Sequence, residues 1–183
     1  VAKQIAVKKA VDDYKIKKLF SFHNSKLRAS SFVKNSSEGV GSHLEGFNTN
    51  YIIGDFNTFK RENIMEAFKN SKKAILSNVR CLIEGVDVPN VEMVYFADPK
   101  FSGIDIVQAM GRPLRNRKIN KDFGYALVPI FVETHKSEKI RDALKRTNYE
   151  PIIQIAKALR DHDDEVAEII DTILTSDSRG KGY

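Results

Sequence analysis

The sequence predicts a three-layer α/β domain, with a mainly parallel sheet between helices and a helical extension at the C-terminal end. Two observations lead to this prediction. Short apolar runs of β type alternate with longer segments of helical period, and after Val132 only helical patterns continue. The alternation is typical of βαβ units, whose strands pair in parallel. We therefore expect an α/β domain at residues 1–134 and a helical extension at residues 135–183.

Five apolar runs, each bounded by Asp, Asn, Gly, Ser or Pro, predict the strands of the sheet. They are Leu19–Phe22, Tyr51–Ile53, Ala74–Leu76, Val91–Ala97 and Tyr125–Val132.

Helical spacing of apolar residues predicts the remaining elements. The expected helices are Ala2–Tyr14, Ser25–Phe32, Thr58–Asn70, Ile104–Met110, Ser137–Arg146, Ile152–Asp161 and Asp164–Leu174. Thr58 has the side chain of an N-cap for its helix. Segment Asn35–Asn50 has neither period and several Gly, Ser and Asn residues, so we expect a loop there.

Composition excludes several classes of protein. The chain has 183 residues with 42% hydrophobic residues, too many for a disordered chain, and no apolar run approaches the ~20 residues of a membrane helix. Cys81 is the single cysteine, which excludes a disulfide framework and a cysteine-based zinc site and fits a reducing, cytoplasmic setting. The four histidines are far apart in sequence, so we expect no metal site. The first residue is Val1 rather than Met, and we expect a piece of a longer protein.

Residues 74–115 contain three segments that could bind a ligand. Ser77 and Asn78 follow a buried strand, at the end where parallel sheets bind ligands. In the segment 84–89, EGVDVP, a glycine permits close backbone approach and a carboxylate can accept from ribose hydroxyls or from an arginine. The segment 108–115, QAMGRPLR, places two guanidinium groups one helical turn apart, where both can reach one polyphosphate.

In this order and at this separation, the segments resemble motifs V and VI of superfamily 2 helicases and translocases. The resemblance extends upstream, where LFSFHNSKLRASSF is similar to motif IV and FKRENIMEAFKNSKKAILSN to the helix leading into motif V. It covers about residues 15–132. Gln108 stands where the DEAD-box branch has His, so the chain looks most like the restriction-enzyme-related "predicted helicase" branch.

The resemblance implies the second RecA-like lobe of an ATP-dependent helicase or translocase. By the family pattern, Arg112 and Arg115 are the catalytic arginine fingers that stabilise charge on the γ-phosphate. Residues at the nucleotide edge would be Gly85, Asp87 and Gln108. Residues contacting the phosphates of a nucleic-acid strand would be His23, Asn24, Ser25, Ser77 and Asn78. Such contacts contain little sequence information.

The chain lacks two parts that a motor hydrolysing ATP needs, a G-x-x-x-x-G-K-[ST] loop and an acidic strand end for Mg²⁺. We therefore expect ATP and Mg²⁺ to be held mainly by an N-terminal RecA-like lobe of the full-length chain, and the isolated chain to be inactive. The expected partners are that lobe and nucleic acid, DNA in preference to RNA, and no membrane.

Two other classes remain open. A complete α/β enzyme or nucleotide-binding protein with a Rossmann-like sheet is disfavoured, because no Gly-rich loop follows the first strand. A nucleic-acid-binding or scaffolding module without motor activity fits the basic clusters, but it leaves the Gln-Gly-Arg-Arg spacing unexplained.

Overall fold

The computed structural model describes residues 2–79, 91–98, 106, 109–110, 124–133, 135, 138–145, 147–161 and 167–168. The chain divides into two compact units. One contains residues 1–100 and 108–129, and the other contains residues 101–107 and 130–183. The boundary expected at residue 134 stays a prediction.

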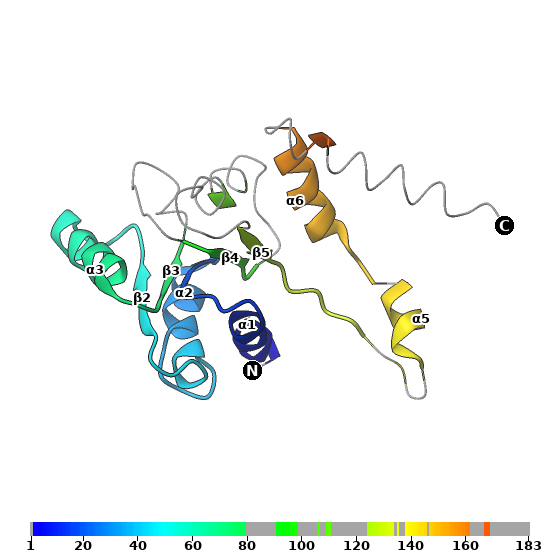
Figure 1. Cartoon of the computed structure of the whole chain (residues 1–183), viewed down its shortest axis with the longest axis horizontal. Coiled ribbons are helices and arrows are strands. Elements are labelled where there is room, and N and C mark those ends of the chain that lie inside the picture. Colours follow the sequence, from blue (N-terminus) through cyan, green and yellow to red (C-terminus); the bar gives the residue numbers. More distant parts are fainter. Residues whose placement is uncertain are drawn as a thin grey trace. The chain divides into compact units, whose positions relative to one another are not determined.

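The first unit is built on a five-stranded sheet whose neighbouring strands are all parallel, in the order β2-β3-β1-β4-β5. The strands are β1 (Lys18–Phe22), β2 (Asn48–Ile52), β3 (Ala74–Asn78), β4 (Met93–Phe96) and β5 (Tyr125–Leu127), and Figure 1 labels them in the colours of the sequence. All five predicted strands are present. The last is shorter than predicted, because β5 ends at Leu127 and not at Val132, and the other strand ends shift by at most three residues. The predicted fold class is thus confirmed.

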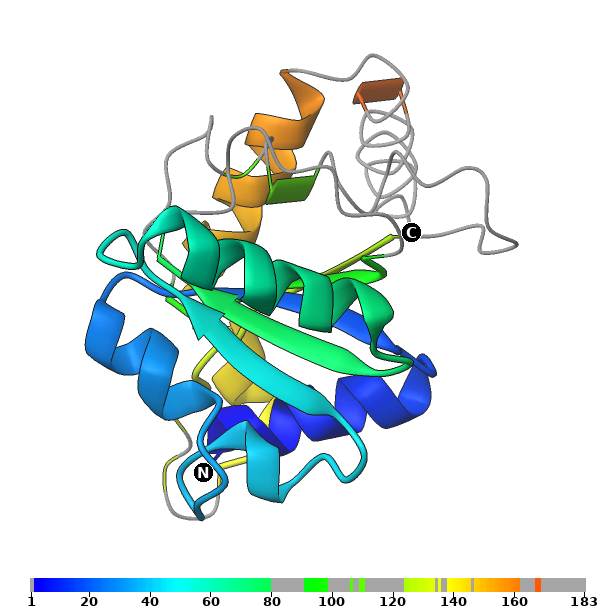
Figure 2. The same ribbon diagram turned by 90° about the vertical axis from the view of Figure 1, so that its left-hand side faces the viewer.

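Helices cover both faces of this sheet. Figure 2 shows α1 (Ala2–Asp13) and α2 (Lys26–Phe32) on one face and α3 (Thr58–Asn70) on the other. Successive side chains of β1 pack against the helices on opposite faces of the sheet, as expected from the alternation of side chains along a strand. Leu19 belongs to the core that includes Val7 of α1, whereas the ring of Phe20 lies 5.1 Å from that of Phe68 in α3. The result is the predicted three-layer arrangement.

Side-chain caps define where α2 and α3 begin. The Oγ of Ser25 accepts a hydrogen bond from the backbone N–H of Arg28, so α2 starts at Lys26, after a turn of three residues from the end of β1. At α3 the N-cap is Asn57, whose Oδ1 accepts from the backbone N–H of Lys60 at 2.9 Å. The expected N-cap, Thr58, is instead the first residue of the helix.

The segment between α2 and β2 is more ordered than its composition predicts. It contains a short 3₁₀ helix, η1 (Val40–Ser42), and buries the side chains of Val40 and Leu44 in the core under α1 and α2. A Cβ at Gly39 would lie 2.0 Å from the carbonyl oxygen of Lys34, so this turn has room only for glycine. The expectation of a loop across residues 35–50 was wrong in this respect.

The second unit contributes two described helices, α5 (Ile140–Lys145) and α6 (Glu150–Arg160). The ends of both helices lie within three residues of the expected ends. Pro151 stands in the first turn of α6 and favours the start of the helix there. Residues 104–110 and 164–174, also expected to be helical, lie largely outside the described residues. None of the helices in the described part of the chain is long and apolar enough to cross a membrane.

Candidate functional site

The ends of β1 and β3 lie next to each other and are joined by hydrogen bonds. Phe22 pairs with Asn78 in the register of the two strands. The backbone N–H of His23 donates to the carbonyl oxygen of Asn78 at 3.0 Å, and the amide Nδ2 of Asn78 donates to the carbonyl oxygen of Ser21, also at 3.0 Å. The turn after β1 is therefore fixed to the end of β3.

The five residues predicted to contact nucleic acid are brought to this one edge, but at different depths. Asn24 is exposed and Ser25 is half-buried, whereas His23, Ser77 and Asn78 are buried. Ser77 and Asn78 are also the last two residues of β3, not the start of a loop as the sequence indicated. The solvent-facing part of this set is the pair Asn24 and Ser25.

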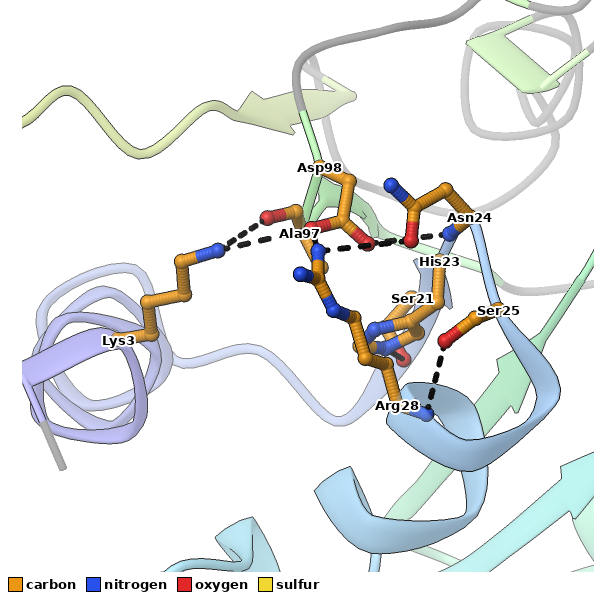
Figure 3. A network of polar contacts seen from close by, with 8 residues as sticks. All are labelled: Lys3, Ser21, His23, Asn24, Ser25, Arg28, Ala97 and Asp98. Carbon is orange, nitrogen blue, oxygen red and sulfur yellow. Dashed lines mark hydrogen bonds and ion pairs between the residues drawn. The ribbon is translucent and has the colours of Figure 1, made fainter.

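Asp98, just after β4, is the buried anchor of the site (Figure 3). One carboxylate oxygen, Oδ2, accepts from the backbone N–H of Asn24 at 3.0 Å. The other, Oδ1, accepts from Nη1 of Arg28 at 2.6 Å. The Nζ of Lys3, from α1, lies 3.8 Å from Oδ1 and donates to the carbonyl oxygen of Ala97 at 2.7 Å. A single buried carboxylate therefore connects a strand end, a turn and two helices.

Arg28 is held on one side and open to water on the other. Its guanidinium bonds Asp98, and Nη1 lies 3.4 Å from Oδ1 of Asn24. Even so, 60% of its side chain is exposed, against 4% for Asp98. A guanidinium oriented in this way keeps N–H donors available for a further acceptor such as a phosphate oxygen.

His23 is a neutral, structural member of the site. Burial lowers its pKa to about 4; the carboxylate of Asp98 opposes this shift, and the positive charges of Lys3 and Arg28 add to it. Its Nε2 lies 3.2 Å from Oγ of Ser21, and its ring lies 5.0 Å from that of Phe32 in α2. The imidazole therefore supports the turn from beneath.

Polar side chains also lie beneath the edge, inside the core. Ser21 pairs in register with Ser77 on one side and Tyr95 on the other, and all three are buried. Within the described part of the chain, the Oγ of Ser77, the Oδ1 of Asn78 and the hydroxyl of Tyr95 have no hydrogen-bond partner. Each such group costs about 1–3 kcal/mol, and departures of this kind from a well-satisfied core are typical of functional regions.

The other predicted site residues cannot be located in the same way. Gly85, Asp87, Gln108, Arg112 and Arg115 lie outside the described residues. Among the residues that are described, no group of three or more His, Cys, Asp or Glu side chains could hold a metal ion.

Sequence reasoning missed Asp98 and Arg28. The signal for Asp98 was present, because it follows a predicted strand and precedes a proline, just as Ser77 and Asn78 stand at the end of another strand. Arg28 had no comparable signal, since a lone basic residue on a short helix is most simply a solvated charge.

Comparison with known proteins identifies the family. The model of the helicase conserved C-terminal domain matches residues 2–117, well over half of the chain. The chain is 36% identical over 70 residues to the putative ATP-dependent helicase IRC3 of Saccharomyces cerevisiae, which covers 38% of this chain and 10% of that protein. It is 25% identical over 154 residues to UvrABC system protein B of Bacillus anthracis, covering 75% of this chain and 23% of the relative. The chain thus spans less than a quarter of the length of either relative.

Solved structures give the same assignment. The DNA-bound ATP-dependent Type ISP restriction-modification enzyme LlaBIII matches with a TM-score of 0.69 and 27% identity, over 92% of this chain and 12% of that one. The C-terminal domain of the DEAD-box protein Dbp5 has the same fold, with a TM-score of 0.56 and 16% identity over 88% of this chain and 79% of its own. The restriction-enzyme-related branch indicated by the sequence is thus represented among the similar structures. The chain belongs to the helicase conserved C-terminal domain family, as the second RecA-like lobe of a superfamily 2 protein.

Proposed function

We propose that this chain is the C-terminal motor lobe of an ATP-dependent helicase or translocase that acts on nucleic acid, DNA in preference to RNA. In the full protein it would close against an N-terminal RecA-like lobe, and its grip on a strand would change with each ATP cycle. The preference for DNA is supported by the likeness to a restriction-modification enzyme that was solved bound to DNA.

One observation supports the strand-binding half of this proposal most strongly. The ends of two adjacent parallel strands hold a turn that presents the exposed side chain of Asn24 and the half-buried side chain of Ser25, next to the guanidinium of Arg28, whose side chain is 60% exposed. Phosphate contacts in nucleic-acid complexes come from such hydroxyl, amide, guanidinium and backbone N–H donors. We assign direct contacts to Asn24 and Ser25, while the buried residues His23, Ser77 and Asn78 shape the turn that presents them.

The nucleotide-binding half of the proposal rests on the family pattern. Arg112 and Arg115 would act as arginine fingers, stabilising charge that develops on the γ-phosphate, and Gly85, Asp87 and Gln108 would line the nucleotide edge of the cleft between the lobes. ATP and its Mg²⁺ would be held mainly by the N-terminal lobe. This division of roles explains the Gln-Gly-Arg-Arg spacing, which a scaffolding module would not need.

The strand-binding function is tested by measuring how the full protein binds labelled oligonucleotides of unrelated sequence as salt is raised. Because phosphate contacts release counterions, affinity should fall steeply, with a log–log slope of about −0.7 per phosphate neutralised on a single strand. Affinities for different sequences should agree within a few-fold, because phosphate contacts contain little sequence information. The proposed preference for DNA requires that matched RNA oligonucleotides bind more weakly. Salt-insensitive, sequence-selective binding would instead identify a recognition module without motor activity.

A further inference from the structure

We propose that Asp98 is a positioning residue for strand binding, because its carboxylate holds the Asn24 turn and the Arg28 guanidinium in the arrangement that receives a phosphate. The inference rests on the proposed function and assigns a residue to it that the family pattern did not supply. Asp98 is too deeply buried to meet the strand itself, with 4% of its side chain exposed.

The geometry supports positioning rather than simple ion pairing. Both oxygens of the carboxylate are used, and one of them binds a backbone N–H, at Asn24, so the path of the main chain is held as well as a side chain. Charge-assisted hydrogen bonds of this kind are about twice as strong as neutral ones. The ammonium group of Lys3 compensates part of the buried charge from the side of α1, as Figure 3 shows.

A second ion pair provides an internal comparison. Nζ of Lys26, on the same helix as Arg28, also lies 2.6 Å from a carboxylate oxygen, that of Asp55 after β2. Both partners of that pair are exposed, at 56% and 64% of their side chains. An exposed pair of this kind is screened by water and salt and contributes little. We therefore expect that the Asp55 carboxylate does not position any group that binds the strand.

We therefore expect removal of the negative charge to have opposite effects on strand affinity at Asp98 and at Asp55. If Coulomb attraction alone acted, neutralising either aspartate would tighten binding to a polyanion, since the protein loses one negative charge. If Asp98 positions the site, Asp98→Asn must weaken binding, because an asparagine can accept at only one of the two bonded positions. Asp55→Asn, which changes the charge by the same amount, should leave binding unchanged or tighten it.

The experiment measures fluorescence anisotropy of a fluorescein-labelled oligothymidylate with the full protein, at one low salt concentration, for the wild type and both variants. We expect about a tenfold loss of affinity for Asp98→Asn, the equilibrium equivalent of one charge-assisted hydrogen bond, and no loss for Asp55→Asn. The strand concentration that half-maximally stimulates ATP hydrolysis should rise by a similar factor, with turnover at saturating strand within about twofold. Hydrogen exchange of the Asn24 amide should accelerate in Asp98→Asn alone.

Several outcomes would overturn the inference. If Asp98→Asn binds as tightly as the wild type or more tightly, Asp98 does not position the site, and the strand-binding function is unaffected. If the wild type does not bind the strand, the proposed function itself fails. Should melting curves show that Asp98→Asn does not fold, Asp98→Glu is compared with Asp55→Glu, two variants that keep the charge and displace the carboxylate by one methylene. A loss about tenfold greater for Asp98→Glu supports the inference, and equal affinities refute it.

Discussion

His23 illustrates how a residue can belong to a functional edge without facing solvent. The resemblance to motif IV placed it among the residues expected to contact nucleic acid, and the structure confirms only that it directly follows β1. Position along a strand could be predicted, but depth could not, because depth depends on Phe32, nine residues further along the chain, packing over the imidazole. For Asp98, too, the position after a strand could be predicted from the sequence. Its contacts with α1 and α2 could not be predicted, because they depend on the tertiary structure.

The buried imidazole predicts a dependence of stability on pH. The pKa of His23 is about 4 in the folded chain and about 6.5 when unfolded, so the unfolded state binds the proton more readily between these values. The stability gained from keeping it neutral is present above about pH 6.5 and is lost as the pH falls toward about 4. Between about pH 7 and about pH 5 the free energy of unfolding should fall by about 2 kcal/mol through this group alone.

Urea denaturation of the wild type and of His23→Gln, compared across this range of pH, measures the effect. Glutamine can still bond Ser21 but cannot take up the proton, so the variant should lose most of the slope between neutral and acidic pH. Parallel pH profiles for the two proteins would show that the imidazole is not held neutral by the fold.

At the scale of elements, the sequence predicted those with a strong apolar period and missed those held by pairing or packing. β2 begins at Asn48, although Asn48, Thr49 and Asn50 have no apolar signal, because the strand lies at the sheet edge and gains its order from pairing with β3. The 3₁₀ turn at Val40 was missed for a related reason: two isolated apolar residues, Val40 and Leu44, form no period and are ordered by the core they enter.

The start of α3 gives a test at this scale. Because the side chain of Asn57 satisfies the backbone N–H of Lys60, Asn57→Ala should lower the free energy of unfolding by about 1 kcal/mol. Thr58→Ala is the matched control, since Thr58 is the residue that sequence reasoning chose as the cap and the structure places inside the first turn; it should change stability by less than about 0.5 kcal/mol. Thermal or denaturant unfolding of the two variants decides between them, and a larger cost for Thr58→Ala would restore the original assignment.

At the scale of the whole molecule, the order of elements and two short motifs were enough to predict both fold and family. Alternating strands and helices dictate a parallel sheet, because each crossover helix must cover a face and return the chain in the same direction. The sheet then places the C-terminal ends of β1 and β3 next to each other, although the two strands lie more than fifty residues apart in the chain. Which side chains at these strand ends are exposed could not be predicted, since exposure is decided by how α1 and α2 pack on the sheet.

The central claim, that this chain supplies a motor lobe, is tested most directly by ATP hydrolysis of the full protein with Arg115 changed. An arginine reaching across the cleft acts chiefly in the transition state, so Arg115→Ala should slow strand-stimulated turnover by about 10³-fold or more while nucleotide affinity stays within a few-fold. Arg115→Lys should rescue little, because lysine keeps the charge and loses the planar fork. Turnover within a few-fold of the wild type for both Arg112→Ala and Arg115→Ala would contradict the motor assignment.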